Sequence, residues 1–137
     1  MTCFSCQEKK AQNQLENAAL SFCKAFYNFD YSEAKVWATP SSLSYLSFLA
    51  SNVQQSHLDK LKSKGASEVS IISSQIEDGS QNAIIICEIK NVLKIDPISG
   101  EAEKVTSLLD TLQLVNDDNK WLVRKDIPQR NEMQNHD

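Results

Sequence analysis

The sequence lacks a cluster of basic residues and has no long apolar run. Its 14 lysines and arginines are scattered and outnumbered by 18 acidic residues, which leaves a formal net charge of −4. Because nucleic-acid binding draws most of its affinity from basic side chains on phosphates, we expect no nucleic-acid partner. No stretch approaches the roughly 20 apolar residues of a membrane-spanning helix, so we predict no transmembrane segment.

The cysteine pattern also falls short of a metal site. Cys3 and Cys6 form a C-x-x-C, but no second such pair follows, and the two histidines stand far apart. A structural zinc site needs four ligands at compatible spacing, so we predict neither a metal nor another cofactor. Cys23 lies beside an apolar helical stripe and Cys87 in an isoleucine-rich segment, which is typical of buried thiols.

The chain is long enough for one domain with one hydrophobic core. It has 137 residues, of which 41% are hydrophobic and 23% charged, as in ordinary soluble proteins. Residues 1–12 are polar after the first cysteines and are expected to be a disordered lead or a lipoprotein tether. Residues 13–127 form the domain, and residues 128–137 a frayed polar tail.

The first half of the domain has helical periodicity. Apolar residues recur at steps of three and four from Leu15 through Phe22, Phe26 and Phe29, which places them on one helix face. Asp30 followed by Glu33 is a capping pattern that opens a short second helix. A third helix is expected from Pro40 to about residue 64, because Thr39-Pro40 ends the second helix and proline is tolerated in a first turn. Gly65 is a natural terminator for it.

After Gly65 the pattern changes to that of strands. Four strands are predicted, over residues 69–76, 83–93, 105–115 and 120–127. Asp117-Asp118-Asn119 is expected to form the last hairpin. The predicted core joins residues of the first helix to the inner face of this sheet: Phe22, Phe26, Phe29, Ile85, Cys87, Ile89, Leu112, Leu114 and Val123.

Three helices followed by long strands, closing on Asp118-Asn119-Lys120-Trp121-Leu122-Val123, resemble the nuclear-transport-factor-2-like (NTF2-like, cystatin-like) superfamily. The segment from Phe22 to Pro40 is similar to its small bacterial branch of unassigned function. The resemblance implies an α+β fold with three N-terminal helices packed in the concave face of a curved, antiparallel, four-stranded sheet. Such cones often hold a pocket; some relatives are isomerases or dehydratases, and others bind ligands or pair as dimers.

The N-terminus resembles the end of a bacterial lipoprotein signal, because Phe4-Ser5-Cys6 precedes a polar segment. This resemblance makes Cys6 the candidate lipidated residue. The protein would then be a lipid-anchored or periplasmic protein of the bacterial envelope, provided that a signal precedes the given sequence. The alternative is an ordinary flexible start and a cytoplasmic protein.

One polar pair is expected on the inner face of the sheet. Strand alternation puts Asp110 on the face of Leu112 and puts Lys125 on the face of Val123, so the two charges should face each other directly or nearly so. They form either a cross-strand ion pair at the sheet edge or the polar anchor of a ligand pocket. The aromatics Tyr27, Trp37, Tyr31 and Tyr45 either line the same pocket or pack the core.

Other polar residues have simpler interpretations. His57 stands in a polar stretch and is predicted to be a solvated helix residue. Ser41-Ser42 are assigned to helix capping and turns. No catalytic residue is predicted, because no second acid matches an isomerase motif.

Two function classes follow. The first is a non-catalytic envelope domain that binds a small ligand or a protein partner through the cone pocket or the sheet face. It includes a homodimer through the outer face of the sheet, where Ile84 and Ile86 are expected. The alternative is an isomerase- or dehydratase-type enzyme acting in the cone pocket.

Overall fold

The computed structural model describes residues 2–77, 79, 81–96 and 98–125, with side chains from residue 9 onward. The helices are α1 (Thr2–Tyr27), α2 (Tyr31–Val36), the 3-10 turn η1 (Pro40–Ser42), α3 (Leu43–Ser51) and α4 (Gln55–Lys64). The strands are β1 (Glu68–Ile76), β2 (Asn82–Ile95), β3 (Ala102–Asp117) and β4 (Lys120–Arg124). The expected tail, residues 128–137, lies outside the described residues.

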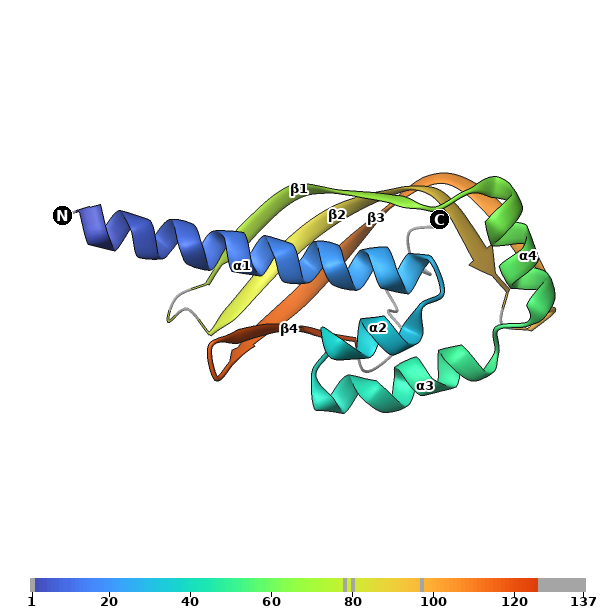
Figure 1. Ribbon diagram of the computed structural model, residues 1–137, viewed down its shortest axis with the longest axis horizontal. Coiled ribbons are helices and arrows are strands. Elements are labelled where there is room, and N and C mark those ends of the chain that lie inside the picture. Colours follow the sequence, from blue (N-terminus) through green and yellow to red (C-terminus); the bar gives the residue numbers. More distant parts are fainter. Residues whose placement is uncertain (1, 78, 80, 97, 126–137) are drawn as a thin grey trace.

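The long helix α1 crosses the concave face of the curved sheet, and its first turns extend beyond the strands (Figure 1). Its apolar stripe is buried there, since Leu15, Ala19 and Phe22 are fully covered. The helix begins earlier than the sequence predicted. Residues 2–12, expected to be a disordered lead, are helical and continue into α1. None of the helices in the described part of the chain is long and apolar enough to cross a membrane.

The short helix α2 begins as its capping pattern predicts. The backbone N–H of Glu33 donates to the Asp30 carboxylate at 3.2 Å, which satisfies one of the free amides of the first turn. Helix α2 lies beside the C-terminal half of α1 and α3 packs next to α2, whereas α4 lies at the far end of the sheet (Figure 1).

The single third helix expected over residues 40–64 is the 3-10 turn η1 followed by two helices, α3 and α4. They are separated at Asn52–Gln54, and α4 starts with a reciprocal capping box between Gln54 and His57. No usual N-cap residue signals this helix start, because glutamine and histidine take the roles that serine and glutamate commonly fill. Gly65 ends α4 as predicted, at a φ of +92°.

The sheet is antiparallel throughout, in the order β1-β2-β3-β4. The predicted last hairpin is confirmed: Asp117 pairs with Lys120, and Asp118 and Asn119 form its two-residue turn. Both turn residues have positive φ, 55° and 66°, which matches the twist of a hairpin of this length. The predicted α+β class and curved four-stranded sheet are thus observed.

The core lies between α1 and the inner face of the sheet. Seven of the nine predicted core residues are buried there: Phe22, Ile85, Cys87, Ile89, Leu112, Leu114 and Val123. Phe26 and Phe29 are only partly buried against this cluster, so the prediction of full burial is wrong for both. Ile84 is 36% exposed on the outer face, as predicted from the inward direction of Cys87.

Candidate functional site

A cavity of about 550 Å³ opens where the end of α1, helices α2 and α3 and the sheet diverge. We call it the cone cavity. Its wall contains all three tyrosines and three of the five phenylalanines of the chain. They are Phe26, Tyr27, Phe29, Tyr31, Tyr45 and Phe48. Its size lies in the range of small-molecule sites.

Aliphatic residues of the sheet close the other side of the cone cavity. Val92 and Leu93 come from the end of β2, and Leu108 from β3. A second hollow, of about 450 Å³, lies along α1 between Lys9 and Asn17 and is lined by that helix alone. Within the described part of the chain no other element encloses that second hollow, so the cone cavity is the better candidate for a binding site.

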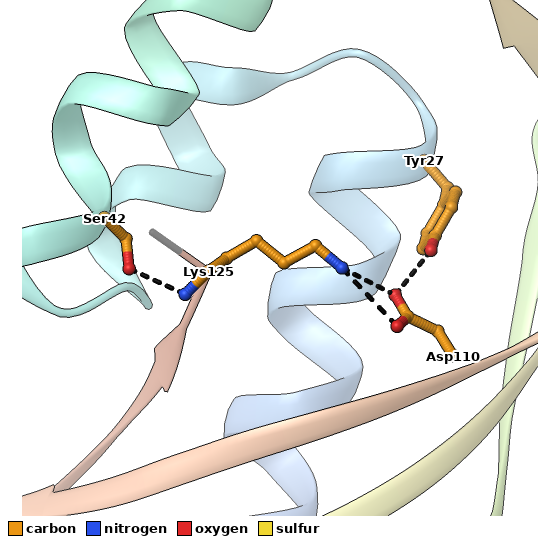
Figure 2. Close-up of polar contacts among 4 residues, drawn as sticks. All are labelled: Tyr27, Ser42, Asp110 and Lys125. Carbon is orange, nitrogen blue, oxygen red and sulfur yellow. Dashed lines mark hydrogen bonds and ion pairs between the residues drawn. The ribbon is translucent and has the colours of Figure 1, made fainter. Parts of the chain in front are cut away.

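Three polar side chains meet at the edge of the cone cavity (Figure 2). The Tyr27 hydroxyl, at the end of α1, donates to Asp110 Oδ2 at 2.5 Å. The ammonium of Lys125 lies 3.1 Å from the same oxygen and 3.4 Å from Oδ1. Tyr27 and Lys125 both line the cavity. Three of the four candidate pocket residues are therefore brought together.

The register explains how Lys125 reaches Asp110. Gln113 pairs with Arg124, so the next position along β4, that of Lys125, falls opposite Leu112. Asp110 precedes Leu112 by two residues on β3, so its side chain lies on the same face of the sheet. The long lysine side chain therefore spans the diagonal between the two strands, within the reach of such neighbours.

The backbone of Lys125 is fixed by Ser42, as Figure 2 shows. The Lys125 N–H donates to the Ser42 hydroxyl at 2.7 Å, and Thr39 Oγ1 lies 2.7 Å from the same oxygen. Ser42 lies in the turn η1 and at the N-cap position of α3, as assigned, but its side chain makes no cap hydrogen bond. Its contact joins residues far apart in sequence, and no local pattern could have predicted it.

The ion pair is buried, although it borders the cavity. The side chains of Lys125 and Asp110 are 6% and 5% exposed. The lysine ammonium also lies 5.2 Å from the centre of the Phe26 ring, a cation–π distance. Because a buried charge is tolerated only when it is paired and hydrogen-bonded, each partner keeps the other in place.

Tyr31 brings a further hydroxyl to the cone cavity. The residue is 8% exposed, and its ring lies edge-on to Phe26 and stacked on Phe29. Burial, with a smaller contribution from the nearby Tyr45, raises the pKa of Tyr31 above its usual value. The phenol is therefore neutral and able to donate a hydrogen bond at all ordinary pH values.

Trp37, the fourth candidate pocket residue, is not among the residues that line the cone cavity. Its indole N–H donates to Glu33 at 3.1 Å. Its backbone carbonyl accepts the Val123 N–H at 2.7 Å, which holds β4 beside the residues that follow α2.

Cys6, the candidate lipidation residue, lies in the first turns of α1. It is distant in sequence from the residues that line the cavity.

Cys23 and Cys87 are fully buried between α1 and the sheet. A hydrogen bond to Cys87, together with burial, raises the pKa of the Cys23 thiol well above its usual value. The same hydrogen bond lowers the pKa of the Cys87 thiol. The burial of both side chains agrees with their predicted place as small apolar residues of the core.

His57 is buried rather than solvated, so that prediction is wrong. The residue is 2% exposed, its Nδ1 accepts the Gln54 N–H at 3.0 Å, and its Nε2 lies 2.7 Å from the Gly100 carbonyl oxygen. Since Nδ1 accepts, Nε2 must carry the proton and donate it. The imidazole thereby connects the start of α4 to the turn between β2 and β3.

No protein-family model and no curated protein sequence matches the chain. Among solved structures, a Campylobacter jejuni protein named as an NTF2-like transpeptidase is similar, with a TM-score of 0.51 and 20% sequence identity. That match covers 80% of this chain and 96% of the other. The intermembrane space region of the chloroplast protein ARC6 matches with a TM-score of 0.39 at 10% identity, over 87% and 91% of the two chains.

Proposed function

Starting from the NTF2-like fold of this chain, we propose that it is a non-catalytic binding domain that holds a small, largely apolar molecule in the cone cavity. The observation that carries this proposal is the cavity itself, of about 550 Å³, walled by six aromatic side chains. Apolar walls with a few convergent polar groups are the usual composition of small-molecule sites.

The polar groups of the cavity favour binding over catalysis. General acid–base chemistry needs a group that is free to take or give a proton. Asp110 accepts from both Tyr27 and Lys125, so its carboxylate oxygens are engaged as structural acceptors. The contacts of Tyr27 and Lys125 with Asp110 fix the ends of α1 and β4 to β3. The cavity therefore has a preformed edge.

An isomerase- or dehydratase-type reaction is the second candidate. The observation that favours it is the position of Asp110 beside a phenol donor at the edge of the cavity. The double variant Asp110→Asn with Lys125→Met distinguishes the two functions. It would abolish proton transfer while leaving an apolar ligand bound, because neither charge of the buried pair is left without its partner.

Ligand binding is tested by adding the neutral hydrocarbon 2-ethylnaphthalene to isotope-labelled protein and following the backbone amide NMR signals. The expected shifts cluster at the cavity, around Leu49, Val92 and Leu108. The variant Leu49→Trp, which fills the cavity, should weaken binding at least about tenfold. Leu43→Trp on the same helix is the matched control, since Leu43 does not line the cavity. Equal effects of the two variants, or shifts confined to the outer sheet face, would refute the proposal.

We also propose that a second copy of the chain covers the outer face of the sheet. Ile72, Ile84 and Leu109 are 55%, 36% and 64% exposed there, and a homodimer would remove them from water. Light scattering across a concentration series tests this. The expected dimer should dissociate in the variant Ile72→Glu, and a monomer at every concentration would refute it.

The envelope location remains a proposal that rests on Phe4-Ser5-Cys6 and the polar residues after it. Expressing the natural gene and measuring the mass of the mature protein tests it. Lipidation adds the mass of the acyl groups at an N-terminal Cys6. An intact Met1 with an unmodified Cys6 would refute it and favour the cytoplasm.

A further inference from the structure

The chemistry of the ligand can be inferred from the polar groups of the cone cavity, if the proposed binding function holds. The first group is the Tyr31 hydroxyl. Tyr31 lines the cavity and is 8% exposed, and among the described residues no hydrogen bond reaches its hydroxyl. Because no fully buried side-chain polar atom of the described residues lacks a partner, this hydroxyl is open to the cavity, and phenol hydroxyls in such sites usually find a partner. A ligand with an oxygen acceptor would supply that partner.

The charges around the cavity decide the charge of the ligand. Asp110 and Lys125 form a pair whose charges cancel. A buried anion would compete with Asp110 for Lys125, and its attraction to Lys94, the other lysine of the lining, is screened because Lys94 is exposed to water. A cation would face Lys125 and the more exposed Lys94, which also lines the cavity. Both charged ligands would lose their hydration with too little compensation.

The aromatic walls favour ligands with flat rings. Phe26, Tyr27 and Tyr31 already meet edge-to-face, with ring centres 5.0 and 5.6 Å apart. Such arrangements leave ring faces and edges that another ring can contact favourably. A flat apolar body therefore fits this wall better than a polar one.

We propose that the cone cavity takes an uncharged, ring-containing apolar molecule whose carbonyl or ether oxygen accepts a hydrogen bond from the Tyr31 hydroxyl. The Asp110–Lys125 pair rejects charged analogues of the same shape. Tyr31 is thus a specificity-determining residue of the cavity.

Four probes with the same ring system test the proposal by equilibrium dialysis against the full chain. They are 2-acetylnaphthalene (a neutral acceptor), 2-ethylnaphthalene (no acceptor), 2-naphthoate (an anion) and 2-naphthylmethylammonium (a cation). The ketone should bind about three- to tenfold more tightly than the hydrocarbon, as expected for one net hydrogen bond. Both ions should bind more weakly than the hydrocarbon.

The variant Tyr31→Phe removes the hydroxyl and keeps the ring. It should bind the ketone and the hydrocarbon equally, while its affinity for the hydrocarbon stays the same or rises. Thr111→Val is the control, because it removes a hydroxyl from the exposed outer face of β3. That control should keep the full preference for the ketone.

Each outcome of this experiment is decisive. A ketone preference that survives in Tyr31→Phe, or tighter binding of the anion, would overturn the ligand class while leaving the cavity as a binding site. Failure of all four probes to bind would instead refute the proposed binding function itself.

Discussion

Replacing Lys125 by methionine is the most informative single perturbation of the site. Methionine keeps most of the apolar stem, so that the change removes chiefly the ammonium. It leaves the Asp110 carboxylate 5% exposed, with Tyr27 as its remaining described partner. Breaking a buried ion pair from one side costs about 3 to 5 kcal/mol, because the other charge stays buried and uncompensated. We expect a loss of this size in the free energy of unfolding.

The double variant Asp110→Asn with Lys125→Met removes both charges and keeps an acceptor for the Tyr27 hydroxyl. It should lie within about 1 to 2 kcal/mol of the wild type, since replacing a buried pair by neutral groups is often nearly neutral. The single and double variants therefore form a strongly non-additive cycle. Lys120→Met, at the exposed start of β4, is the control and should change stability by less than about 0.5 kcal/mol.

Urea unfolding followed by tryptophan fluorescence measures these differences, because Trp121 is only 4% exposed in the folded chain. If Lys125→Met costs less than about 1 kcal/mol, the pair behaves like a solvated surface pair. That result would refute the burial of the pair and its role as a fixed edge of the cone cavity.

Three further predictions concern stability. Phe22→Ala should cost about 3 to 5 kcal/mol, and Phe26→Ala clearly less, because only Phe22 is fully buried; equal losses in urea unfolding would contradict this. His57→Ala should cost about 2 to 4 kcal/mol through two lost hydrogen bonds, whereas Ser56→Ala, at an exposed neighbour, should cost little. Stability should fall as the pH rises above about 10, because the unfolded chain ionises Tyr31 while the folded chain, with its raised pKa, does not; Tyr31→Phe should flatten that slope, and an unchanged slope would contradict the burial of the phenol.

Several features that depend only on residues near one another in the sequence were predicted correctly. The stripe from Leu15 to Phe22, the strand alternation around Cys87 and the Asp118-Asn119 turn all act through near neighbours in sequence, and each is observed. The meeting of Asp110 and Lys125 was predictable as well, because a short hairpin leaves little freedom of register.

The remaining features depend on contacts between distant segments. His57 is buried by the turn at Gly100, 43 residues away, and Ser42 is used by the Lys125 backbone, 83 residues away. Phe26 and Phe29 lie on the predicted apolar face, but the space above them stays open because helices α2 and α3 diverge from the sheet there. A cavity forms where neighbouring elements leave space between them. The periodicity of a single helix or strand carries no information about that space.

A crystal structure of the protein under xenon pressure tests the central claim most directly. Xenon enters open apolar cavities and avoids packed or water-filled ones. We predict a xenon site in the cone cavity, between Phe26, Leu49 and Leu108. A structure in which these three side chains close on one another, with no xenon between them, would contradict the proposed binding site.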